Sequence, residues 1–115
     1  MRRDDPTYVS DMLDRCLRVQ RLIDGLDFEA FAEDEPVRVT VAHYLQDMGE
    51  AARRVSSAFQ GAHSEVPWRE IIATRNRIAH DYTDIDFDIV WDVANAEVPS
   101  LIDVLRPLAV AEDAG

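Results

Sequence analysis

Apolar residues recur along the chain at the three- and four-residue spacing of amphipathic helices, in four separate blocks. These blocks predict helices over residues 6–23, 36–59, 67–80 and 87–105, and a short extra turn of helix can form at 28–31. No block alternates apolar and polar residues for long enough to predict a β-strand. The pattern therefore predicts an all-α fold, a small up-down bundle of four to five helices.

The sequence also predicts where two of these helices begin or bend. Asp5 is the expected N-cap of the first helix, with Pro6 at its first helical position. Pro99 lies inside the fourth block. Its missing N–H and its ring would cost about 3 kcal/mol in a straight helix. We therefore expect a kink in the last helix near Val98.

Size and composition limit the class of protein. The chain has 115 residues, 47% of them hydrophobic, which suffices for one core and predicts a single domain over residues 1–115. No segment approaches the roughly 18 apolar residues of a membrane span, and nothing resembles a targeting peptide. Cys16 is the only cysteine, and no Cys/His cluster has zinc-binding spacing. We expect a cytoplasmic protein without a membrane partner, a cofactor or a structural metal.

The charge balance restricts a role with nucleic acids. The chain has 23 acidic residues against 12 basic ones, a formal net charge of −11. Such a chain is repelled by phosphate backbones at long range, so any contact with nucleic acid must be local. Residues 69–82 are locally basic, because this segment contains three arginines and only two acidic residues, Glu70 and Asp81.

One arginine in this basic segment lies at an unexpected position. On a helical wheel, residues 68–82 have an apolar stripe about 120° wide. The stripe consists of Trp68, Ile71, Ile72, Ile78, Ala79 and Tyr82. Arg75 falls in the middle of it. Because a guanidinium is costly to bury alone, we expect Arg75 either to pair with a carboxylate, Glu50 or Asp47, or to open into a cleft or a subunit interface. Arg77 points away and, with Asp81 four residues on, is expected to be a solvated surface charge.

Polar residues with complementary chemistry follow Arg75 in the sequence. Asn76 and His80 lie four residues apart, and Tyr82 follows. A fixed cation for a phosphate, an imidazole that titrates near neutrality and polar groups that orient them are what a metal-free phosphodiester-cleaving site needs. His80 and Tyr82 also have a structural interpretation. His80 can be a capping or surface residue, and the ring of Tyr82 can pack on the end of the helix.

The pattern Arg75, four residues, His80, one residue, Tyr82 resembles the catalytic motif of HEPN-domain ribonucleases, specifically toxins of the HepT type. Further residues match this resemblance along nearly the whole chain. They are Gly49-Glu50-Ala51, Pro67-Trp68, Arg75-Asn76 and Val90-Trp91. The resemblance implies a HEPN-like helical domain and a metal-independent endoribonuclease that acts as a homodimer. It also implies a type VII-like toxin-antitoxin pair, in which the partner is a minimal nucleotidyltransferase, MntA.

The resemblance assigns roles to individual residues. Arg75 and His80 would be catalytic, with Asn76 and Glu50 in support, and the antitoxin would inactivate the nuclease by transferring AMP to Tyr82. A homodimer also fits the wheel, where Arg75 and His80 are about 140° apart, too far for one straight helix to aim both at one phosphate. The alternative is a non-catalytic HEPN dimer that binds a nucleotide or serves as a scaffold for its transferase partner, with Arg75 merely structural.

Overall fold

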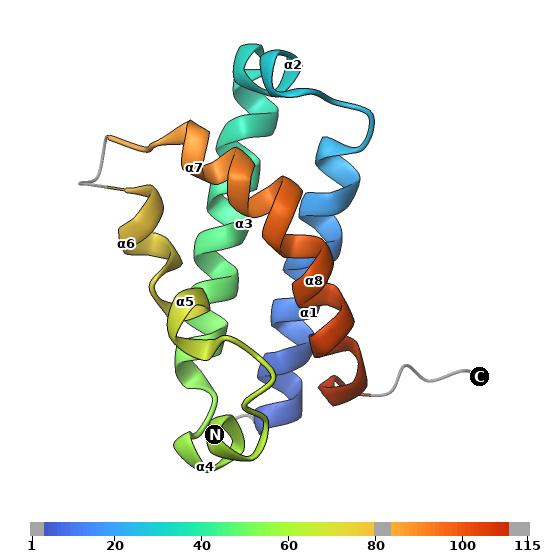
Figure 1. The fold of residues 1–115 in the computed structure, drawn as a ribbon, viewed down its shortest axis with the longest axis vertical. Helices are drawn as coiled ribbons and strands as arrows, with labels where there is room; N and C mark the ends of the chain where they lie inside the picture. The colour runs from blue at the N-terminus through green and yellow to red at the C-terminus, as the bar shows by residue number, and fades with distance from the viewer. Residues whose placement is uncertain (1–3, 80–83, 111–115) are drawn as a thin grey trace.

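The computed structural model describes residues 4–79 and 84–110, and this part of the chain is all-helical, as the sequence predicts (Figure 1). The helices are α1 (Asp5–Ile23), α2 (Phe28–Glu33), α3 (Glu35–Arg54), α4 (Ser57–Ala62), α5 (Trp68–Ile72), α6 (Thr74–Ile78), α7 (Phe87–Asp92) and α8 (Val98–Leu105), with a π-helix, η1 (Val93–Glu97), and a 3₁₀ turn, η2 (Arg106–Leu108). Within the described residues no strand forms, and the β pairing consists of one isolated antiparallel bridge between Ala79 and Ile85.

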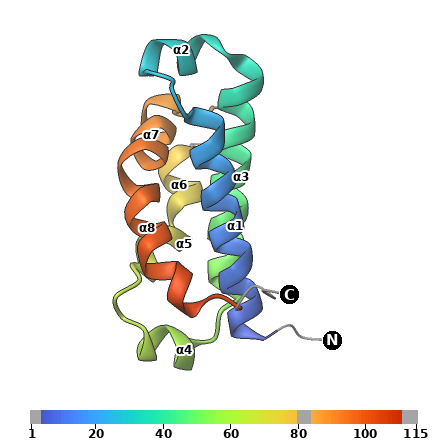
Figure 2. The ribbon, with the colours of Figure 1, turned by 90° about the vertical axis from the view of Figure 1, so that its right-hand side faces the viewer.

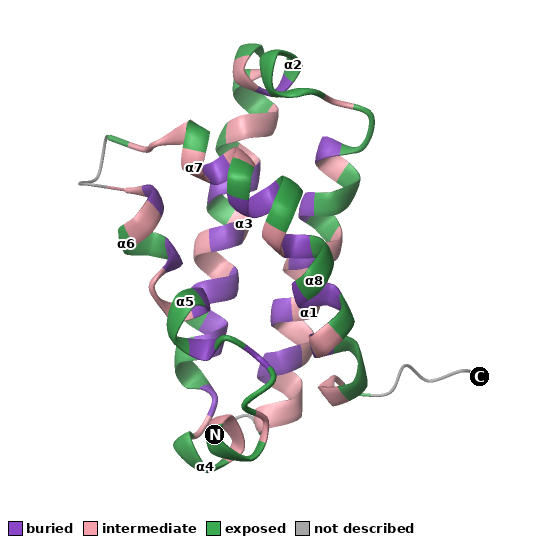
Figure 3. Ribbon diagram, viewed as in Figure 1, coloured by how far each residue is buried: buried purple, intermediate pink, exposed green. Residues whose placement is uncertain are grey.

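The two long helices α1 and α3 run antiparallel and lie side by side along one side of the bundle, with α5, α6, α7 and α8 on the other side (Figure 2). The α8 helix packs on α1, whereas α5 and α6 pack on α3. Buried positions line the inward faces of these helices (Figure 3). Fully buried side chains include Val9, Met12, Phe31, Leu45, Met48, Ile78 and Leu105.

The start of α1 differs by one residue from the prediction. Asp4, not Asp5, is the N-cap, and its side chain accepts a hydrogen bond from the Thr7 N–H at 3.0 Å. The Asp5 carboxylate instead accepts hydrogen bonds from the N–H and the hydroxyl of Ser56, at 2.8 and 2.7 Å. Asp5 therefore ties the beginning of α1 to the corner after α3.

The helix predicted over 36–59 is divided at this corner. Val55 leaves the helical conformation, with ψ 137°, and Ser56 caps the short helix α4 through a hydrogen bond from the Phe59 N–H to its side chain at 3.1 Å. A serine in extended conformation is a favoured N-cap, because its hydroxyl satisfies a free N–H of the first turn.

The kink predicted near Val98 is confirmed, and it takes the form of a π-helix. The Val98 N–H donates to the Val93 carbonyl, five residues back. In an α-helix the acceptor would be the carbonyl four residues back. Pro99 has no N–H to donate, and its ring would collide with the carbonyl four residues earlier in a straight helix. The wider turn before Pro99 relieves this conflict, so α7, η1 and α8 continue as one bent helix.

We expect Cys16 to report on unfolding. Its side chain is buried on α1, where the thiol donates to Met48 Sδ at 3.2 Å, and burial raises its pKa to about 12. At pH 8 only roughly one folded molecule in ten thousand would hold the reactive thiolate. Alkylation by iodoacetamide, followed by mass spectrometry, should be on the order of a thousandfold slower than in urea. Rapid labelling of the folded protein would contradict this packing.

None of the helices in the described residues is both long enough and apolar enough to cross a membrane.

Candidate functional site

The segment that carries the motif is two short helices, not the single helix predicted over 67–80. The chain turns at Ala73, where ψ is −4°, far from the value near −42° of an α-helix. The buried side chains of the two helices are Trp68, Ile71, Thr74 and Ile78. Thr74 therefore occupies the core position that a continuous helix would have given to Arg75, and its hydroxyl donates to the Glu70 carbonyl at 3.2 Å.

A close approach of two backbones sets α5 against α3. A Cβ atom added to Gly49 would lie 2.9 Å from the carbonyl oxygen of Ile71. The other end of α5 is held by Trp68, whose ring is buried and whose indole N–H donates to the His63 carbonyl at 2.9 Å. The glycine of the Gly49-Glu50-Ala51 motif thus has a structural role, because a side chain there would push α5 away.

Arg75 is exposed on the surface of α6. Across residues 4–79 and 84–110, its guanidinium takes part in no hydrogen bond or ion pair. The expectation that Arg75 lies on the buried face is therefore wrong, and the turn at Ala73 is the reason. The structural ion pair considered for Arg75 is also absent from this described part of the chain.

Glu50, the first carboxylate considered for Arg75, is engaged elsewhere. It pairs with Arg53 at 2.6 Å and with Arg54 at 3.5 Å on the outer face of α3. The hydrogen bond from Arg53 holds the pKa of Glu50 below its ordinary value. The structure therefore does not bring Glu50 to Arg75.

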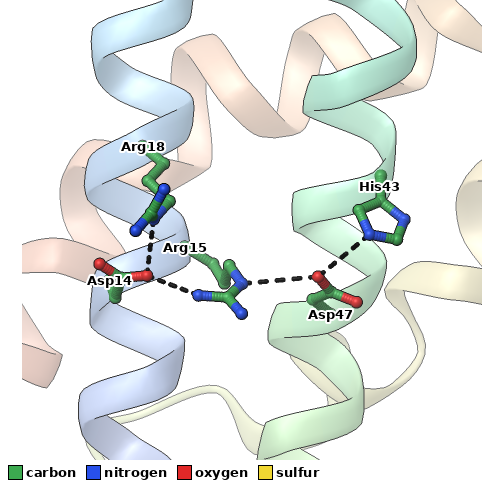
Figure 4. Close-up of polar contacts among 5 residues, drawn as sticks. All are labelled: Asp14, Arg15, Arg18, His43 and Asp47. Atoms are coloured by element: carbon green, nitrogen blue, oxygen red, sulfur yellow. Dashed lines mark hydrogen bonds and ion pairs between the residues drawn. The ribbon is translucent and has the colours of Figure 1, made fainter.

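Asp47, the second carboxylate, belongs to a charged network between α1 and α3 (Figure 4). It accepts from Arg15 at 3.5 Å and lies 3.4 Å from His43, while Arg15 also pairs with Asp14. Burial alone would raise the pKa of Asp14, but hydrogen bonds from Arg18 and Arg15 lower it overall. This network neutralises arginines of α1 and leaves Arg75 out.

Asn76 is exposed next to Arg75 and lines an open groove of about 970 Å³ between α4 and the α5–α6 segment. Arg69, Gln60 and Ser57 line the same groove, and Trp68 contributes to its wall. The groove thus presents polar side chains beside the exposed guanidinium.

His80 and Tyr82, the other motif residues, lie outside the described residues. The α6 helix ends at Ile78, and Ala79 is extended with φ −133° and ψ 121°. The angle of about 140° between Arg75 and His80 assumed a continuous helix, so it does not apply. The two ends of the intervening segment are paired, because Ala79 bridges Ile85 and the Asp86 N–H donates to the Ile78 carbonyl at 2.7 Å.

Arg77 is not the solvated surface charge predicted from the sequence. It is half-buried and forms two hydrogen bonds with Glu97 of η1, at 3.0 and 2.7 Å. These hydrogen bonds raise the pKa of Arg77. Asp81, its expected partner, lies outside the described residues. One signal for the pair was available in the sequence: Glu97 comes seven residues after Val90, so in a regular α-helix it would fall on the buried face.

Within residues 4–79 and 84–110, no group of three or more His, Cys, Asp or Glu side chains is placed to hold a metal ion.

Comparisons with known proteins extend over most of the chain. The family described as Ribonuclease HepT-like matches residues 12–108. A protein of Caldanaerobacter subterraneus provisionally named as an RNase is 30% identical over 94 residues, which cover 82% of this chain and 84% of that protein. A protein of Thermococcus cleftensis named probable ribonuclease HepT is 28% identical over 101 residues, 88% of this chain and 92% of its own. No solved structure matches the chain.

Proposed function

The chain belongs to the ribonuclease HepT-like family, and from this premise we propose that it is a metal-independent endoribonuclease that acts as a homodimer. Several of its relatives are named as ribonucleases. We further propose that it is the toxin of a type VII-like toxin-antitoxin pair, neutralised by AMP transfer to Tyr82 from a MntA-like nucleotidyltransferase.

The observation that carries this proposal is the state of Arg75. Some arginines are neutralised by carboxylates, as Arg15 is by Asp14 and Asp47 and Arg77 is by Glu97, but the Arg75 guanidinium of the motif is exposed and without such a partner in the described part of the chain. A guanidinium stays charged at any physiological pH and can donate two parallel hydrogen bonds to a phosphate. On a chain with a net charge of −11, an available cation of this kind supplies the local attraction that RNA binding requires.

In the proposed mechanism, Arg75 stabilises the negative charge that develops on the non-bridging oxygens of the scissile phosphate. His80 acts as general base and removes the proton of the ribose 2′-hydroxyl. The 2′-oxygen then forms a bond to phosphorus while the bond from phosphorus to the 5′-oxygen breaks. The leaving 5′-oxygen takes a proton from an imidazolium, which His80 of the partner subunit can supply. The products are a 2′,3′-cyclic phosphate and a 5′-hydroxyl.

Modification of Tyr82 would inactivate this site by electrostatics. The phenolic oxygen would attack the α-phosphate of ATP bound to the transferase, so that AMP becomes attached to Tyr82 and pyrophosphate leaves. An added phosphate carries negative charge and strong hydrogen-bond acceptors. It would compete with RNA for Arg75 and repel the RNA backbone.

Expression with and without the transferase tests the proposal. Alone, the purified chain should cleave RNA in the presence of EDTA, leave 2′,3′-cyclic ends, and spare RNA whose 2′-hydroxyls are methylated. After co-expression, the intact mass should increase by whole AMP units that map to Tyr82, and cleavage should be lost. Tyr82→Phe is the matched control, because it keeps the ring and removes the acceptor oxygen.

Two results would contradict the proposal. Cleavage of the methylated RNA would exclude attack by the 2′-oxygen. An unmodified protein that binds the transferase but neither cleaves RNA nor slows growth would favour the alternative, a HEPN dimer that acts as a scaffold.

A further inference from the structure

The ion pair between Arg77 and Glu97 joins the helix that carries Arg75 to the π-turn of the last helix. Arg77 belongs to α6 and Glu97 is the last residue of η1, twenty positions further along the chain. Both oxygens of the carboxylate are engaged, one by each terminal nitrogen of the guanidinium. Such paired hydrogen bonds fix the orientation of the two groups as well as their distance.

The α6 helix depends on contacts of this kind because it is very short. It has five residues, and only Thr74 and Ile78 are buried. A single helical turn is not stable by itself, so its orientation is determined by what it packs against. The α3 and α7 helices contact α6, and the Arg77–Glu97 pair adds a directional contact at the residue two positions after Arg75.

The π-turn explains how Glu97 can take this role. In a regular α-helix Glu97 would point within about 20° of Val90, toward the core. The extra residue in the turn puts Val98 in the core, where it is fully buried, and leaves the Glu97 side chain 41% exposed at the edge of the bundle. The irregularity that Pro99 requires therefore also delivers the carboxylate to Arg77.

No other ion pair in the described residues joins two elements through both oxygens of one carboxylate. The pair of Arg53 with Glu50 is also double, but it lies within α3. Arg15 crosses from α1 to α3 through one hydrogen bond, at 3.5 Å. The Arg77–Glu97 pair is thus a distinct connection, and it is attached to the motif helix.

We infer that Arg77 and Glu97 are positioning residues for Arg75: their ion pair holds α6 in the orientation from which the Arg75 guanidinium meets the scissile phosphate. This inference rests on the proposed ribonuclease function. Neither residue contacts RNA in this role. Their effect on the reaction passes through Arg75, which shares α6 with Arg77.

Steady-state cleavage of an RNA oligonucleotide by the full chain tests the inference. Glu97→Gln keeps the shape of the side chain and removes its charge, so it should lower kcat roughly ten- to a hundredfold, with a smaller change in KM. Arg77→Lys, which keeps the charge but loses the fork, should show a similar loss. The exchanged pair, Arg77→Glu with Glu97→Arg, should recover part of the lost activity. Asp14→Asn, which breaks two ion pairs of α1, is the matched control and should retain the wild-type rate.

A double-mutant cycle separates positioning from general stability. If Glu97 acts through Arg75, Glu97→Gln should change the residual rate of Arg75→Ala by less than about twofold. Losses that multiply in the double variant, or a single Glu97→Gln variant with wild-type kcat, would overturn the inference. Circular dichroism and thermal unfolding of each variant identify any loss of activity that comes from misfolding. If a single variant misfolds, the cleavage rate of the exchanged pair decides, and an exchanged pair that folds but recovers no activity would overturn the inference.

Failure of the proposed function would look different. In that case the wild-type chain would not cleave RNA, or Arg75→Ala and His80→Ala would cleave it as well as the wild type does. If the wild type cleaves and Arg75→Ala does not, while both variants of the Arg77–Glu97 pair retain full activity, only the positioning role is excluded.

Discussion

Arg75→Ala should reduce the kcat of RNA cleavage by about 10²–10³-fold, the usual loss when one group that stabilises transition-state charge is removed. The stability of the fold should hardly change, within about 0.5 kcal/mol, because the side chain is exposed. His80→Ala should be at least as severe, since a general acid or base contributes about 10²–10⁴-fold. The measurements are cleavage kinetics, growth after induced expression, and urea unfolding of each variant.

Arg106→Ala is the control for charge, because Arg106 is also exposed and lies in η2, away from α6. It removes the same positive charge and should leave kcat unchanged. If Arg106→Ala and Arg75→Ala reduced cleavage equally, stronger general repulsion between RNA and a more acidic chain would explain the loss, and Arg75 would have no specific role. A strong loss of stability in Arg75→Ala would likewise contradict the exposed position of its side chain.

Gly49→Val should destabilise the fold by about 3 kcal/mol and lower the unfolding temperature by on the order of 10 °C or more. A Cβ at this position would lie 2.9 Å from the Ile71 carbonyl oxygen, which is backbone and cannot rotate away. The two methyl groups of valine extend further, so α3 and α5 would have to separate. Because α5 leads directly into α6, cleavage should fall together with stability.

Gly61→Val provides the comparison for this variant. Gly61 also lies in a helix, but an added Cβ there would meet no atom within 4 Å. The two variants change the chain in the same way, so the difference in their unfolding free energies isolates the contact with Ile71. Equal stability of the two variants in urea would show that α3 and α5 do not approach each other so closely.

Most of the fold was predictable because apolar spacing is a local property of the sequence. The stripes that place Val9, Met12 and Leu45 in the core are read directly from residues three and four apart. The bend before Pro99 was predictable for the same reason, since one residue type causes it. The division after α3 was missed because Val55 is compatible with a helix, although Ser56 is a recognisable N-cap.

The candidate site was less predictable, because its geometry depends on contacts between distant segments. The wheel put Arg75 in the core since it extended one helix through Ala73, a residue that carries no local signal for a break. The partner of Arg77 lies twenty residues away, beyond any rule based on helical spacing. Spacing and chemistry identified the motif, but only the packing of α5, α6 and η1 shows that Arg77 pairs with a carboxylate while Arg75 is exposed.

The order of these contacts along the chain has a consequence for biosynthesis. The apolar face of α1, made first, is covered in part by α8, which the ribosome makes nearly last. Glu97 likewise emerges twenty residues after Arg77. A nascent chain that stalls between them would expose the α1 face and invite aggregation or proteolysis. Under the positioning role inferred for the Arg77–Glu97 pair, it would also carry an unanchored α6, so an unfinished product of translation should not cleave the RNA around it.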